Sequence, residues 1–123
     1  MVSLTKCLTG KTCIFKRYFY DTYEIEANTL SACFESKQVV VNPDGTQRKK
    51  IKLQVWDTAG SEQYRSINSL YYKKAAVVLL IYSATDADSL DALDYWVEEL
   101  DKNASPNIVR FLVAAKIDDI DET

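Results

Sequence analysis

The sequence predicts one α/β domain over residues 1–123, with a mainly parallel sheet and helices on both faces of it. Three observations predict this class. Strand-like and helix-like patterns alternate along the chain. One continuous apolar run and a second, mainly apolar stretch have the length of strands that are covered on both faces. Two glycine-containing loops with charged residues each follow a strand end, where ligands bind in such sheets.

The first element, Met1–Leu4, is short and apolar and fits the last residues of a strand. The next eight residues match the second half of the phosphate-binding pattern G-x-x-x-x-G-K-[ST] through Gly10, Lys11 and Thr12. Gly10 lets backbone N–H groups face a phosphate, Lys11 supplies a positive charge, and the Thr12 hydroxyl can ligate Mg²⁺. Read alone, Gly-Lys-Thr is more often an ordinary helix start.

A hairpin is the next predicted unit. A helix over Thr12–Tyr20 is followed by a loop to residue 32 and then by a strand over Phe34–Asn42. Pro43–Thr46 is a turn signal, because proline presets φ and glycine accepts a positive φ. Ile51, Leu53 and Val55 alternate with polar residues, which predicts a half-buried strand over Lys49–Trp56.

This strand runs into Asp57 and, three residues later, Gly60. A carboxylate at the carboxyl end of a strand points toward the ligand crevice of an open α/β sheet and suits Mg²⁺. Gly60 has no Cβ, so its N–H can approach a ligand closely. The spacing alone is also typical of a plain turn.

The second half of the chain repeats the strand and helix pattern. A loop running into a short helix is expected up to Lys74, and buried strands are expected over Ala75–Tyr82 and Ile108–Ala115. Between them Asp88 and Ser89 can cap a helix that ends between Asn103 and Pro106. Its predicted apolar stripe consists of Leu90, Leu93, Val97 and Leu100.

Bulk properties exclude several classes of protein. The net charge is −3 without a long run of one sign, so we expect no nucleic-acid partner. No apolar run approaches about 18 residues, and no signal peptide is recognisable. Three irregularly spaced cysteines form neither a zinc pattern nor a disulfide framework, so we expect a reducing, cytoplasmic setting. We also expect a monomer.

These residues together resemble the Rab branch of the Ras-like small GTPases. The likeness is carried by Trp56-Asp57-Thr58-Ala59-Gly60, Glu62, Tyr64-Arg65-Ser66, Tyr71-Tyr72 and Tyr82. Ala104–Val109 and Thr29-x-x-Ala32-x-Phe34 look like the early-endosome group. The resemblance implies a P-loop NTPase fold of the Ras-like G-domain type, which would be incomplete at both ends in this chain. It also implies a GTP-dependent switch in vesicle and endosomal trafficking. It also implies GTP or GDP and Mg²⁺ as ligands, and effectors, an exchange factor and a GTPase-activating protein as partners.

The resemblance also implies residue roles. Lys11 would neutralise the β- and γ-phosphates, while Thr12, Thr29 and Asp57 would hold Mg²⁺, Thr29 only in the GTP state. The nucleotide-binding set implied by the resemblance is Gly10, Lys11, Thr12, Cys13, Thr29, Asp57, Gly60, Lys116 and Asp118. The aromatic triad that would present the nucleotide state to effectors is Phe34, Trp56 and Tyr71.

The chain departs from the family pattern at several of these positions. Thr5 replaces the first loop glycine, Ser31 replaces a glycine after Thr29, and Ala115 replaces the asparagine of Asn-Lys-x-Asp. Ser61 replaces the catalytic glutamine that orients the attacking water, so hydrolysis should be slow. No prenylated cysteine tail is recognisable, so endosomal membrane association is expected only with a lipidated tail outside this chain.

Three hypotheses remain open at this point. The chain is a slow GTP hydrolase that switches an effector surface, a degenerate effector-binding module without turnover, or a fragment of a longer GTPase. Two smaller alternatives also stand. The aromatic triad would serve as ordinary hydrophobic packing, and Lys116 would be a plain surface lysine because Ala115 breaks its motif.

Overall fold

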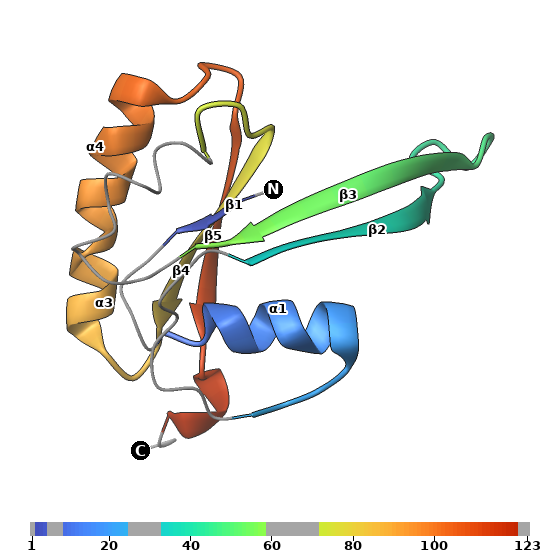
Figure 1. Ribbon diagram of the computed structural model, residues 1–123. Coiled ribbons are helices and arrows are strands. Elements are labelled where there is room, and N and C mark those ends of the chain that lie inside the picture. The colour runs from blue at the N-terminus through green and yellow to red at the C-terminus, as the bar shows by residue number, and fades with distance from the viewer. Residues whose placement is uncertain (1, 5–8, 25–32, 59–71, 121–123) are drawn as a thin grey trace.

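A computed structural model describes residues 2–4, 9–24, 33–58 and 72–120. They form a five-stranded sheet in the order β2-β3-β1-β4-β5, in which only the β2–β3 pair is antiparallel. Helix α1 lies on one face of the sheet, and α3 and α4 lie on the other (Figure 1). The predicted α/β class is confirmed. The strands are β1 Val2–Leu4, β2 Cys33–Val41, β3 Lys49–Asp57, β4 Val77–Ser83 and β5 Val109–Ala115, and the helices are α1 Lys11–Tyr20, α3 Ala87–Asp91, α4 Leu93–Asn103 and the 3₁₀ turn η2 Ile117–Asp119.

The predicted hairpin is confirmed and extends away from the helices (Figure 1). Its turn is stabilised by Asp44, whose Oδ1 accepts the N–H of Thr46 at 3.1 Å. This bond lowers the pKa of the Asp44 carboxyl. Gly45 has φ 74°, which a residue with a Cβ rarely adopts. The turn chemistry therefore sets the register that pairs Val41 with Lys49 and Phe34 with Trp56.

Strand β1 has three residues but lies at the centre of the sheet. Ser3 pairs with Asp57 of β3 on one side and with Leu79 of β4 on the other. Because all three strands run parallel, their carboxyl ends meet at one edge of the sheet. This edge is where both predicted ligand loops begin.

The hydrophobic core on the α4 face differs in part from the apolar stripe that the sequence predicted. Its buried residues are Tyr72, Val78, Leu80, Leu93, Trp96, Leu100 and Ile108. The predicted single helix is interrupted at Ala92. Leu93 and Leu100 are buried as predicted, and Trp96, which was not in the predicted stripe, is buried with them. Leu90 and Val97, both predicted in the stripe, are 44% and 37% exposed.

The predicted helix cap is also wrong. Asp86 is the N-cap residue, and its side chain accepts the N–H of Asp88 at 3.1 Å. Ser89 is instead buried and bonded to Ser83, whose N–H it accepts at 2.8 Å. Ser89 thus connects α3 to β4 through this hydrogen bond.

No helix among the described residues has the length and apolar character needed to cross a membrane.

Strand β5 forms as predicted, but it is not the buried strand that its apolar run indicated. Val109, Phe111 and Leu112 are 49%, 53% and 63% exposed. The reason is position, because β5 lies at one edge of the described sheet, beyond β4. An apolar run specifies a strand, but neighbouring elements decide whether that strand is covered.

Candidate functional site

The candidate site begins where α1 starts. Gly10 precedes the helix with φ 97°, in the left-handed region, and its carbonyl accepts the N–H of Ile14 at 3.1 Å. A residue with a Cβ would be strained there, which explains why glycine stands before Lys11. The first turn of this ten-residue helix presents its positive dipole end at the carboxyl edge of the sheet.

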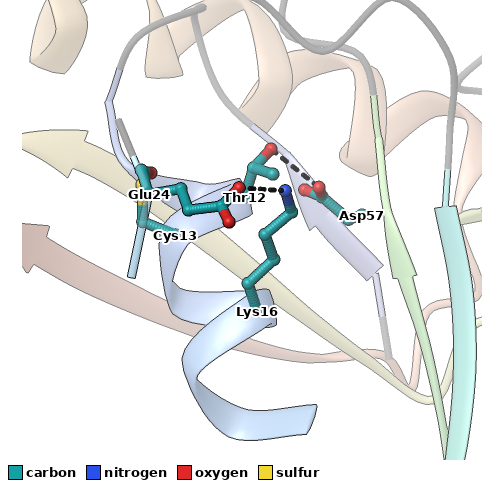
Figure 2. Close-up of polar contacts among 5 residues, drawn as sticks. All are labelled: Thr12, Cys13, Lys16, Glu24 and Asp57. Carbon is teal, nitrogen blue, oxygen red and sulfur yellow. Dashed lines mark hydrogen bonds and ion pairs between the residues drawn. The ribbon is translucent and has the colours of Figure 1, made fainter. Parts of the chain in front are cut away.

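Thr12 joins α1 to the end of β3. Its Oγ1 donates a hydrogen bond of 2.7 Å to Oδ2 of Asp57 (Figure 2). Asp57 is fully buried, and its Oδ1 accepts no hydrogen bond within the described part of the chain, although the residue has further interactions. Two residues 45 positions apart in sequence, both predicted as Mg²⁺ ligands, thus lie in direct contact.

Lys11 is 5% exposed although its side chain is charged. Part of the side chain lines an apolar cavity of about 280 Å³ beneath α1, together with Phe15, Leu53 and Val55. A buried ammonium group strongly favours a negatively charged neighbour. The position beside the helix start therefore suits a phosphate.

The end of β5 lies beside the same loop. A Cβ placed on Gly10 would be 3.9 Å from Cβ of Ala115 and 4.0 Å from Cε of Lys116. Lys116 has φ 58° and begins η2, in which Asp118 is exposed. The segment predicted to bind the base thus begins close to Gly10, at the start of α1.

Contacts between α1 and Glu24 were not predicted from the sequence. Cys13 Sγ donates to the Glu24 carbonyl at 3.5 Å, and Lys16 Nζ lies 3.9 Å from Glu24 Oε2 (Figure 2). They hold the chain segment after α1 against the first half of the helix. The sequence has no signal for this pairing, because these residues share no motif. Two buried threonines that border the site, Thr9 and Thr58, were also missed.

The predicted effector surface is present in part. Phe34 and Trp56 lie opposite one another on β2 and β3, with ring centroids 4.7 Å apart. Trp56 packs against the core of the α4 face, whereas Phe34 is 42% exposed. The Trp56 ring is therefore held by the core, and the Phe34 ring is exposed to solvent.

Several predicted site residues fall outside the described residues: Thr29, Gly60, Ser61 and Tyr71, together with Thr5 and Ser31.

The donor set fits Mg²⁺ bound with a phosphate. A hydroxyl and one carboxylate are hard oxygen ligands, and Mg²⁺ is usually held by one or two carboxylates and by substrate phosphates. Among the described residues no group of three or more His, Cys, Asp or Glu side chains could hold a metal by itself. A hydroxyl and a carboxylate in contact suit a metal whose remaining ligands are phosphate oxygens and water.

Comparison with known proteins gives one consistent family. The model of the Ras family matches residues 1–123. The putative ras-related protein Rab-5B of Dictyostelium discoideum is 39% identical over 118 residues, which are 96% of this chain and 53% of that protein. The GTP-binding protein YPT52 of Saccharomyces cerevisiae is 37% identical over 128 residues, covering 100% of this chain and 55% of that protein.

The Ras-like GTP-binding protein RYL2 of Yarrowia lipolytica is 41% identical over 110 residues, covering 89% of this chain and 50% of that protein. The chain thus spans about half the length of the curated relatives it matches. The matched sequence contains the loop before α1, the end of β3 and the segment after β5, which meet at one edge of the sheet. The resemblance inferred from the motifs is confirmed, and the chain belongs to the Ras family as a Rab-type small GTPase domain.

Proposed function

We propose that this domain binds GTP and GDP with Mg²⁺ and acts as a nucleotide-dependent switch in vesicle and endosomal trafficking, with slow intrinsic hydrolysis. The observation that carries the proposal is the 2.7 Å contact between the Thr12 hydroxyl and the buried Asp57 carboxylate. The contact supports the proposal, because two oxygen ligands so close together would both reach one ion. A helix start and a buried lysine adjoin it, and both favour phosphate.

Each described residue of the candidate site has a role in this proposal. Thr12 and Asp57 hold Mg²⁺, and Lys11 and the backbone after Gly10 bind the β- and γ-phosphates. When bound, Mg²⁺ neutralises negative charge on the phosphate oxygens. Asp118 would hydrogen-bond the guanine edge, and Lys116 would lie along the base beside Gly10.

Two substitutions reduce the activity that we propose. Ala115 has no amide side chain with which to hydrogen-bond the base and its surroundings, so guanine nucleotides bind more weakly than with asparagine there. Ser61 is too short to orient water as glutamine does, so hydrolysis without a GTPase-activating partner is slow. The proposed switch is therefore long-lived in its GTP state.

A second candidate function is effector binding without turnover. It is favoured by the Phe34–Trp56 pair, which the β2–β3 register holds together through neighbouring backbone bonds. The pair requires no nucleotide for its arrangement. An aromatic surface of this kind suits the apolar face of a trafficking effector.

One experiment separates these functions. The protein is purified, denatured and analysed for released nucleotide by chromatography, before and after loading with GTP and Mg²⁺. We expect near-stoichiometric guanine nucleotide, with GTP in excess of GDP. Lys11→Met should lose it, whereas Arg17→Met, which alters an exposed ion pair on the same helix, should retain it. A folded protein that releases no guanine nucleotide after loading would refute the switch and leave the binding module.

A further inference from the structure

The outer half of the β2–β3 hairpin carries a concentration of positive charge. Residues 37–52 contain five Lys or Arg residues and one acidic residue, a net charge of +4, whereas the whole chain has a net charge of −3. The remaining residues therefore have a net charge of −7, and the hairpin projects away from the helices (Figure 1). The five cations, called the basic end below, are all exposed: Lys37, Arg48, Lys49, Lys50 and Lys52.

The basic end has no acidic partner among the ion pairs of the described residues. Lys37 lies over the ring of Tyr18, with Nζ 4.9 Å from the ring centroid, and the other four cations form none of these ion pairs. The one acidic residue of the stretch, Asp44, accepts the N–H groups of Thr46 and Gln47. Because buried charges need partners, any surface that covers this end must be anionic.

The basic end is charged on both faces of the hairpin. Side chains alternate along β3, so Lys49 lies on the same face as Leu53, toward α1, and Lys50 lies on the opposite face. Each face also exposes an apolar side chain beside these lysines. Ile51 is 45% exposed on the α1 side, and Val40, which pairs with Lys50, is 60% exposed on the other side. A protein partner on one face would contact only part of this charge, whereas a layer of anionic headgroups surrounds the end and meets both faces.

We propose that the basic end binds anionic phospholipid headgroups at a membrane surface, with Val40 and Ile51 entering the headgroup layer. Each basic residue near an anionic surface adds to the attraction, and apolar side chains beside it add burial. This contact is separate from a lipidated tail, on which the membrane association expected from the sequence depends. It does not rest on nucleotide binding either, because the candidate site around Asp57 takes no part in it.

The length of the hairpin keeps the candidate site away from the surface. Lys49 and Asp57 are the two ends of β3, and eight residue steps of about 3.4 Å place them about 27 Å apart. The Debye length at physiological ionic strength is about 8 Å. Repulsion between an anionic surface and the acidic remainder of the chain around that site is therefore largely screened while the basic end is in contact.

Co-sedimentation of the 123-residue protein with vesicles tests the proposal. We expect binding to phosphatidylcholine vesicles that contain about 30 mol % phosphatidylserine, weaker binding as salt is raised, and no detectable binding to phosphatidylcholine alone. The double variant Lys49→Gln/Lys50→Gln removes one charge from each face. It should weaken binding about 25-fold, because each charge near the surface contributes about fivefold. The matched control, Lys73→Gln/Lys74→Gln, removes two exposed charges outside the hairpin and should bind as the parent does.

A second probe separates a lipid surface from an acidic protein segment. Val40→Thr keeps the shape of the side chain but should weaken vesicle binding about threefold, because apolar burial in the headgroup layer is lost. The same variant should bind soluble polyglutamate as the parent does. Melting curves confirm that each variant folds. The proposal is overturned if the parent does not bind the anionic vesicles, as for a surface that takes polyglutamate alone, if it binds phosphatidylcholine equally well, or if the Lys49→Gln/Lys50→Gln variant binds as the parent does.

Discussion

The contact between Thr12 and Asp57 gives the sharpest prediction. Thr12→Val removes the hydroxyl and keeps a β-branched side chain of similar size, so the helical preference at that position changes little. The buried Asp57 carboxylate then loses a hydrogen bond of 2.7 Å. A hydrogen bond to a charged group contributes about 1.5–3 kcal/mol. Thr12→Ser keeps the hydroxyl and is the matched control.

Two effects follow from this loss. Without ligand, the Val variant should melt about 6–12 °C below the parent, at about 4 °C per kcal/mol for a domain of this size. With GDP and Mg²⁺ at about 100 times the parent dissociation constant, the parent gains about 2.7 kcal/mol of stability. If the lost hydroxyl weakens binding about 100-fold, the Val variant gains only about 0.4 kcal/mol.

The assay is a thermal melt of each variant with GDP, in Mg²⁺ and in EDTA. The parent and Thr12→Ser should each lose most of the ligand-induced stabilisation in EDTA, whereas Thr12→Val should have little to lose. The reasoning is refuted if Thr12→Val melts with the parent and keeps the same Mg²⁺-dependent gain. If Thr12→Val melts at a lower temperature without ligand but keeps the full Mg²⁺-dependent gain, Thr12 has a structural role and no role in metal binding.

Three further predictions concern the base pocket, a buried tyrosine and the core. Ala115→Asn should tighten GDP binding by about tenfold, because one added hydrogen bond is worth roughly 1 kcal/mol or more. Titration with a fluorescent nucleotide measures the affinity of both proteins, and an unchanged affinity would contradict the proposed base site. Burial and the bond to Glu99 raise the pKa of the Tyr72 hydroxyl well above its ordinary value of 10.0. The unfolded chain therefore loses this proton first, and the associated stability, complete below pH 10.0, falls as the pH rises above it. Tyr72→Phe should show a flatter decline of melting temperature with pH in that range. Equal slopes for the variant and the parent would show that the Tyr72 hydroxyl does not cause the decline. Trp96→Ala should cost about 3–5 kcal/mol of unfolding free energy, whereas Val97→Ala on the exposed side of α4 should cost under about 1 kcal/mol; chemical denaturation distinguishes them, and similar losses would invalidate the described packing.

The sequence predicted most elements because each carries a local signal. The hairpin had alternating apolar residues and a proline–glycine turn, and its strands and turn lie where expected. The two ligand motifs predicted Lys11, Thr12 and Asp57, and the structure brings Thr12 and Asp57 into contact. Motifs of this kind are readable because the chemistry demands particular residue types at a fixed spacing.

The errors arose where a property depends on distant residues. The interruption at Ala92 is not signalled by glycine or proline, so the helix was predicted as one piece and Leu90 and Val97 were placed in its buried stripe. The apolar run of β5 predicted burial, but burial requires a neighbour on both faces. The contacts of Glu24 with α1 belong to no motif and were missed.

The sequence by itself determined the family and the order of the elements, and it predicted the residue types of the candidate site, because these depend on local patterns and on residue identity. The tertiary structure alone decided which side chains meet, that β1 pairs with both β3 and β4, and that Phe111 and Leu112 of β5 are exposed. The physical reason is that hydrogen-bond partners and burial depend on elements far apart in the chain. Strand order and helix phase determine them, and no short stretch of sequence encodes either one.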